Sequence, residues 1–230
     1  MKCPDLTERL LRLSAAELRL LADLYQVRFA DEAILDGLQV LASARGEELS
    51  RLGFVRSGAT AQGETVHWLS QTGCRAAREL LPEEAGSGMR AYAALRLRHE
   101  LARGALYLAL RRAGMPPGAY RAEPRLAYRS AAGLGQRTLV PDCSVTAGPR
   151  RALCEVDCGT EGAQQLRHKW LRYREWLEEA GERRLYVLCV ETASLAATLA
   201  AAGLQASVHD SPETLARAMW ADLGGTGDEA

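Results

Sequence analysis

The strongest constraint on the fold of this 230-residue chain is a change in its hydrophobic period. As far as Leu52 the apolar residues recur at helical spacing, and residues 53–70 then form two short, β-prone runs. After residue 119, short strand-like runs alternate with long helical segments. Helices followed by a hairpin, and then strands joined by helices, predict two parts of different construction. We expect an α/β chain (α+β overall) whose second part has a central mixed sheet flanked by helices.

The first part has the sequence order of a winged helix-turn-helix domain. Ser14 and Glu17 have the spacing of a capping box, Asp31 can cap a second helix, and a third helix is predicted over 42–52. The runs GFVRS and ETVHWLS then predict a hairpin, and a further helix begins at Thr72. The stretch HWLSQTGCRAA resembles the wing and exit helix of many bacterial DNA-binding domains. We therefore predict a winged helix-turn-helix over residues 1–85.

The acidic, small-residue stretch at residues 83–88 is the predicted linker, so the second domain is expected over residues 86–230. The tail from about 224 to 230 is predicted to be disordered. Between them we expect a long helix at 89–113, strands at 119–123, 138–140, 152–156, 185–190 and 205–208, and helices at 161–180, 194–202 and 212–222.

Composition excludes several classes of protein. No apolar run approaches the roughly 20 residues of a membrane-spanning helix. The N-terminus has acids where a signal peptide would be apolar, which favours a cytoplasmic location. The six cysteines form no CxxC pair, so a structural zinc site is poorly supported. We expect Cys143, Cys154 and Cys189 to be buried, because they lie within apolar runs.

The net charge of zero conceals an uneven distribution of charge along the chain. Residues 1–89 carry 10 basic and 13 acidic side chains, residues 90–184 carry 18 and 10, and the remainder carry 1 and 6. Arginine is well suited to phosphate contact, so the middle segment is compatible with DNA. A solvated basic face is the alternative interpretation.

Three acids follow or end short apolar runs in the middle of the chain. Asp142 follows a strand-like run that ends in proline, and Glu155 and Asp157 alternate with Val156. In a regular strand Glu155 and Asp157 face the same side, and Asp142 on a neighbouring strand can join them. Such a cluster favours a hard divalent cation, Mg²⁺ or Mn²⁺, with Glu123 as a further ligand. Alternatively, Asp142 forms a turn and nearby arginines pair with the other two acids.

This arrangement resembles the PD-(D/E)xK nuclease superfamily and, more narrowly, the plasmid replication-relaxation family. The resemblance rests on RHELA at 98–102, the PD at 141–142, EVDCGTE at 155–161 and KWLRY at 169–173. It implies a winged helix followed by a nuclease-like domain that acts on double-stranded DNA. The implied catalytic residues are Asp142, Glu155, Asp157 and Lys169, and the implied metal ligands are Asp142, Glu155, Asp157 and Glu123. The superfamily's usual lysine position is occupied by Asp157, and Lys169 on the next helix is a candidate to replace it.

A winged helix places its third helix in the major groove and its wing on the backbone. The candidate DNA contacts are Ser43, Arg45, Ser50 and Arg51 on that helix and Arg56 on the wing. The excess of acids in residues 1–89 weakens this assignment, because nonspecific affinity comes mainly from phosphate neutralisation. A role of this domain in homodimerisation is the alternative.

Three functions remain open from the sequence. The first, which we favour, is a DNA-binding protein of the replication-relaxation type whose nuclease-like domain binds DNA and has lost cleavage. The second is a Mg²⁺-dependent DNA endonuclease. The third is a transcriptional regulator or assembly module that dimerises through its second domain.

Overall fold

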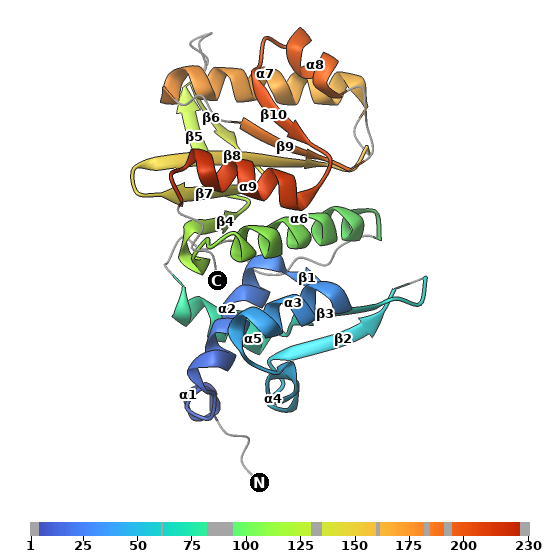
Figure 1. Ribbon diagram of the computed structural model, residues 1–230, viewed down its shortest axis with the longest axis vertical. Coiled ribbons are helices and arrows are strands. Elements are labelled where there is room, and N and C mark those ends of the chain that lie inside the picture. Colours follow the sequence, from blue (N-terminus) through green and yellow to red (C-terminus); the bar gives the residue numbers. More distant parts are fainter. Residues whose placement is uncertain are drawn as a thin grey trace. The chain divides into compact units, whose positions relative to one another are not determined.

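The computed structural model (Figure 1) describes residues 5–60, 62–81, 94–129, 135–159, 162–181, 185–190 and 195–225. Its contacts divide the chain into two compact units. The first contains Met1–Arg112 and Pro116–Gly118, and the second contains Ala113–Met115 and Ala119–Ala230. The helix after the predicted linker is therefore part of the first unit, although the sequence placed it in the second domain. The predicted linker at 83–88 and the end of the predicted tail, 226–230, lie outside the described residues.

The first unit combines helices with a small antiparallel sheet. Its elements are α1 (Leu6–Leu10), α2 (Ala15–Val27), β1 (Phe29–Ala30), α3 (Glu32–Ala42), α4 (Gly46–Arg51), β2 (Val55–Ala59), β3 (Thr65–Leu69), α5 (Gln71–Leu80) and α6 (Ala94–Arg112). The strand order is β1-β3-β2, with both pairs antiparallel. The predicted hairpin is thus confirmed, and β1 adds a third strand that the sequence analysis did not predict.

Helix caps explain where most of these helices begin. Ser14 and Glu17 form the predicted capping box at α2, and the Asp31 side chain accepts a hydrogen bond of 2.8 Å from the Ile34 N–H at α3. The predicted third helix over 42–52 is wrong at its beginning. Ser43 adopts a left-handed conformation with φ of 54°, which ends α3, and α4 begins at Gly46.

A buried polar contact joins α6 to α2. The Tyr107 hydroxyl donates to Asp23 Oδ1 at 2.5 Å, and Arg111 Nε donates to the same oxygen at 3.1 Å. Asp23 is fully buried, and burial raises the pKa of its carboxyl above the ordinary value while Arg111 opposes that shift. This contact holds the long helix within the first unit, because an unmatched carboxylate would be costly at this depth.

A tight corner connects the hairpin to α5. The Ser70 N–H donates to the Phe54 carbonyl at 2.8 Å, and the Ser70 hydroxyl donates to the Gly53 carbonyl at 2.7 Å. The same hydroxyl oxygen caps α5 by accepting from the Gly73 N–H at 3.1 Å. A Cβ at Gly73 would lie 2.2 Å from the Phe54 carbonyl oxygen. The corner therefore requires serine and glycine in the Leu-Ser-x-x-Gly pattern.

Replacing Gly73 with alanine should destabilise the first unit by about 2 kcal/mol or more, because the backbone at Phe54 must move. Gly118→Ala is the matched control, since a Cβ there meets nothing within 4 Å. Thermal unfolding followed by circular dichroism compares the two variants with the wild type. Equal melting of both variants would contradict the close approach at this corner.

The second unit is built on a five-stranded mixed sheet. Its elements are η1 (Pro117–Ala119, which begins in the first unit), β4 (Tyr120–Ala122), β5 (Leu126–Arg129), β6 (Gln136–Leu139), β7 (Cys143–Ala147), β8 (Arg150–Asp157), α7 (Ala163–Ala180), β9 (Leu185–Cys189), α8 (Leu195–Ala201), β10 (Ala206–His209) and α9 (Pro212–Asp222). The sheet order is β10-β9-β8-β7-β4, in which β8, β9 and β10 are parallel and β7 is antiparallel to both neighbours. The predicted mixed sheet flanked by helices is confirmed.

Helices cover both faces of this sheet. On one face, Trp170 and Tyr173 of α7 and Leu199 of α8 form a core cluster with Leu153 of β8 and Val187 of β9. On the other face, α9 packs against β9 and β10 (Figure 1). The central strand β8 is consequently buried on both faces, as expected for a strand in the middle of a covered sheet.

The structure corrects the predicted surroundings of Asp142. The sequence placed Asp142 at the end of a strand over 138–140 that neighbours the strand of Glu155. Instead, β6 pairs with β5 in a separate two-stranded sheet. Asp142 directly precedes β7, a strand that the prediction lacked, and β7 pairs with β8. Strands β7 and β8 therefore form the hairpin that brings Asp142 beside Glu155.

Candidate functional site

Two acids meet at the beginning of β7 and the middle of β8. Cys143 pairs with Cys154, a register that puts Asp142 opposite Glu155 and on the same face of the sheet. Asp142 Oδ2 accepts a hydrogen bond of 2.8 Å from the Val156 N–H, and its carbonyl accepts one of 3.0 Å from the Glu123 N–H. The backbone of three strand regions therefore fixes the position of Asp142.

Helix α7 supplies two side chains to Glu155. Lys169 Nζ lies 2.7 Å from Glu155 Oε2, and the Tyr173 hydroxyl donates to Glu155 Oε1. Residues four apart lie on one face of a helix, and both of these side chains contact Glu155. The sequence analysis did not include Tyr173 among the site residues, although the K-x-x-x-Y spacing was the signal for it.

Glu155 is 1% exposed, and its surroundings disfavour the charged form. Burial and the negative charge of Asp142 raise the pKa of Glu155 well above its ordinary value, and Lys169 opposes this shift. The Lys169 ammonium supplies the positive charge beside Glu155. The cluster is therefore a buried acid pair with one ammonium group and one phenol hydroxyl against Glu155.

The other two predicted acids have separate roles in the backbone. Asp157 is 7% exposed and shares the face of Glu155, but its Oδ1 accepts a hydrogen bond of 2.8 Å from the Gly159 N–H in the turn after β8. Glu123 has a positive φ of 46° directly after β4. The predicted three-acid cluster thus becomes one close pair, Asp142 and Glu155, with Asp157 in the turn that follows.

These residues do not fit a Mg²⁺ or Mn²⁺ site as they are arranged. Within the described ranges, no group of three or more His, Cys, Asp or Glu side chains is placed to hold a metal ion. Both oxygens of Glu155 contact Lys169 or Tyr173, so neither is available to a metal ion in this arrangement. The cation that faces Glu155 is the Lys169 ammonium.

The predicted DNA contacts of the first unit lie on its surface. Ser43, Arg45, Ser50, Arg51 and Arg56 are all exposed. Arg45 is the residue before α4 and its side chain makes no capping hydrogen bond. Arg51 is partly engaged, because its Nε donates to Glu48 Oε2 at 2.6 Å. Arg45 and Arg56 are therefore the better candidates for phosphate contact.

A polar contact that the sequence analysis did not predict fixes the hairpin against α3. The Ser57 hydroxyl lies 2.8 Å from His67 Nδ1, and His67 Nε2 lies 3.1 Å from Glu32 Oε1. Because a carboxylate only accepts, Nε2 carries the proton that it donates to Glu32, and in the neutral imidazole Ser57 then donates to Nδ1. The three side chains tie β2 and β3 to the beginning of α3.

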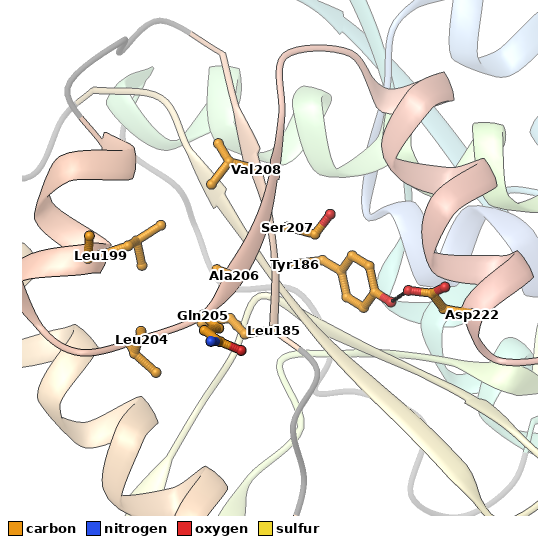
Figure 2. Close-up of a pocket in the computed structure, with 10 residues that line it drawn as sticks. Leu185, Tyr186, Leu199, Leu204, Gln205, Ala206, Ser207, Val208 and Asp222 are labelled. Carbon is orange, nitrogen blue, oxygen red and sulfur yellow. Dashed lines mark hydrogen bonds between the residues drawn. The ribbon is translucent and has the colours of Figure 1, made fainter.

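An open hollow of about 480 Å³ surrounds the edge strand β10 (Figure 2). Leu199 and Leu204 lie on one side of the strand, and Tyr186 and Asp222, joined by a hydrogen bond of 2.5 Å, lie on the other. The lining residues thus belong to both faces of the sheet and do not enclose one cavity. None of the predicted site residues lines it, so we place the candidate site at Asp142 and Glu155.

The chain is thus a two-unit, mixed α/β protein with a buried acid pair, a lysine and a tyrosine at its central strand. The family model described as replication-relaxation matches residues 9–188, and the chain belongs to that family. No curated protein and no solved structure matched the chain. Within the described residues, every helix is too short or too polar to cross a membrane.

Removing the Tyr173 hydroxyl should destabilise the second unit by about 1–3 kcal/mol, because Glu155 Oε1 loses a donor in the core. Tyr128→Phe is the matched control. The Tyr128 hydroxyl is buried in the same cluster without a hydrogen-bond partner among the described residues, so its loss should be neutral or stabilising. Urea unfolding of Tyr173→Phe and Tyr128→Phe measures both effects. A greater loss in Tyr128→Phe would contradict the assigned bond.

The stability of the second unit should fall as the pH rises through the pKa of Glu155. The raised pKa means that the folded state holds this proton more tightly than the unfolded chain, whose glutamates titrate near pH 4.3. The stabilisation is present below that value and is lost at higher pH. Glu155→Gln should remove this part of the pH dependence. The substitution Trp68→Phe confines tryptophan fluorescence to the second unit, so fluorescence-detected unfolding in that background measures the stability of this unit. Curves of stability against pH that run parallel with and without Glu155→Gln would refute the prediction.

Proposed function

We propose that this protein binds double-stranded DNA and that its second unit has a nuclease-like fold that has lost cleavage. The observation that carries the proposal is the order of the first unit, α2-β1-α3-α4-β2-β3, with the sheet order β1-β3-β2. This order supports a winged helix, and we assign α4 as its recognition helix and the β2–β3 hairpin as its wing. Membership of the replication-relaxation family supports a DNA-associated role.

The acid cluster supports binding without cleavage. In-line cleavage of a phosphodiester by a metal-dependent nuclease needs carboxylate oxygens that are available to the metal. Here the Glu155 oxygens contact Lys169 and Tyr173, and Asp142 Oδ2 accepts a backbone hydrogen bond. The acids that the resemblance assigns to a nuclease-like site thus make hydrogen bonds that are internal to the protein.

A Mg²⁺-dependent endonuclease is the second candidate, and one observation favours it. Asp142, Glu155 and Lys169 come together from β7, β8 and α7, although the usual lysine position after the second acid is Asp157. An ammonium group beside two acids is chemically suited to orient a water molecule or to stabilise charge on a phosphate. Opening of the Lys169–Glu155 contact would be required before these acids could bind a metal.

The affinity for a duplex of about 30 base pairs should fall steeply between 50 and 200 mM salt, because phosphate contacts release counterions. Arg45→Ala and Arg56→Ala should each reduce the slope of log affinity against log salt by about one. Arg217→Ala on α9 is the control, because Arg217 is exposed and lies far along the chain from the wing. Fluorescence anisotropy measures all four proteins. No binding of the wild type at low salt would reject DNA binding and favour an assembly or dimerisation module.

Incubation with supercoiled plasmid in Mg²⁺, Mn²⁺ or EDTA distinguishes the two candidates. The proposal expects no metal-dependent nicking by the wild type. Metal-dependent nicking that is lost in Asp142→Asn would establish the endonuclease instead. Nicking that persists in Asp142→Asn would indicate a contaminating nuclease and leave the binding function as proposed.

A further inference from the structure

The charges along α7 run against the helix dipole. The segment 163–174 contains five basic or imidazole side chains and no acid, and the acids follow: Arg167, His168, Lys169, Arg172 and Arg174 precede Glu175, Glu178 and Glu179. The dipole favours acids near the amino end of a helix and bases near its carboxyl end. This charge order therefore does not stabilise the helix and needs another explanation.

The acids of α7 are engaged within the protein. Arg137 of β6 lies 3.3 Å from Glu175, and the Arg129 N–H of β5 donates to Glu179. The β5–β6 hairpin thus packs along the second half of the helix and offsets part of its negative charge. In the first half two basic side chains are also engaged within the protein: Lys169 pairs with Glu155, and Arg174 Nε lies 3.8 Å from Glu178 Oε1.

The remaining basic side chains of the first half face outward. Arg167, His168 and Arg172 are exposed, and we call them the α7 outer face. No hydrogen bond or ion pair to another described residue holds Arg167 or His168 in the structure. Arg172 Nη2 donates to the Thr138 carbonyl of β6, which fixes one guanidinium and leaves its other donors toward solvent.

We propose that the α7 outer face binds the phosphate backbone of double-stranded DNA. This inference rests on the proposed function and names a contact surface for it on the second unit. Arg167 and Arg172 are about 140° apart around the helix and His168 lies between them, so the three side chains span the outward side of α7. A guanidinium forms paired hydrogen bonds with phosphate oxygens. The Lys169 side chain points inward to Glu155. In this proposal the DNA phosphate backbone therefore lies over the outer face of α7, away from Asp142 and Glu155.

Arg167→Glu is the cleanest test, because Arg167 contacts no described residue through a hydrogen bond or ion pair and its replacement should leave the fold intact. We expect the slope of log affinity against log salt to fall by about one in Arg167→Ala and by about two in the double variant Arg167→Ala/Arg172→Ala. Arg167→Glu should weaken binding further than Arg167→Ala. Arg217→Glu changes the net charge by the same amount as Arg167→Glu and should keep the wild-type slope.

The outcomes separate this inference from the proposed function. If the wild type binds the duplex and Arg167→Glu binds with the same affinity and slope, the α7 outer face is not a DNA contact, and the proposed function stands. If Arg217→Glu weakens binding as much as Arg167→Glu, the effect is one of net charge and the surface assignment fails. If the wild type does not bind at 50 mM salt, DNA binding itself fails. Circular dichroism melting confirms that each variant is folded.

Discussion

The buried carboxyl group of Glu155 sets the architecture of the second unit. A carboxyl at 1% exposure on the central strand must be matched by donors or by a proton. Lys169 and Tyr173 supply the donors from adjacent turns of α7, so the helix can cross the sheet only with that face inward. The β5–β6 hairpin then packs on α7, and Tyr128 enters the same core cluster. One polar group thus fixes the rotation of a helix and, through it, the position of a second small sheet.

The first unit depends on a different kind of constraint, the close approach of backbone segments. Ser70 and Gly73 bring the beginning of α5 against the residue before β2, where a larger side chain would collide with the Phe54 carbonyl. The Asp23–Tyr107–Arg111 contact draws α6 onto α2. Because that contact is buried and specific, the long helix belongs with the first unit even though it follows the predicted linker. Acidic, small-residue composition indicated a linker, but it carried no information on which unit the next helix would join.

Local signals in the sequence predicted much of the fold. The capping box at Ser14 and the cap at Asp31 involve contacts within three residues, so their patterns can be read directly. The KWLRY stretch likewise identified Lys169 as a site residue, and its four-residue spacing from Tyr173 puts both side chains on one face of α7. The pairing between strands that are far apart in the sequence could not be predicted. Strand β7 is five residues long and directly follows Pro141-Asp142, and the sequence analysis predicts no strand there. That error placed Asp142 on the wrong strand but beside the correct partner.

The metal prediction rests on the spacing of three acids, and spacing does not reveal the hydrogen bonds that these acids make. In the structure an ammonium group and a phenol hydroxyl lie against Glu155. This arrangement has a consequence for how α7 functions. Its inner face compensates a buried charge, and this face must be preserved for the unit to fold. The outer face takes no part in compensating the buried charge, so the basic residues there can be selected for contact with a partner. If the outer face binds DNA as proposed, that affinity does not depend on any chemistry at the inner site, because the side chains of the two faces make separate contacts.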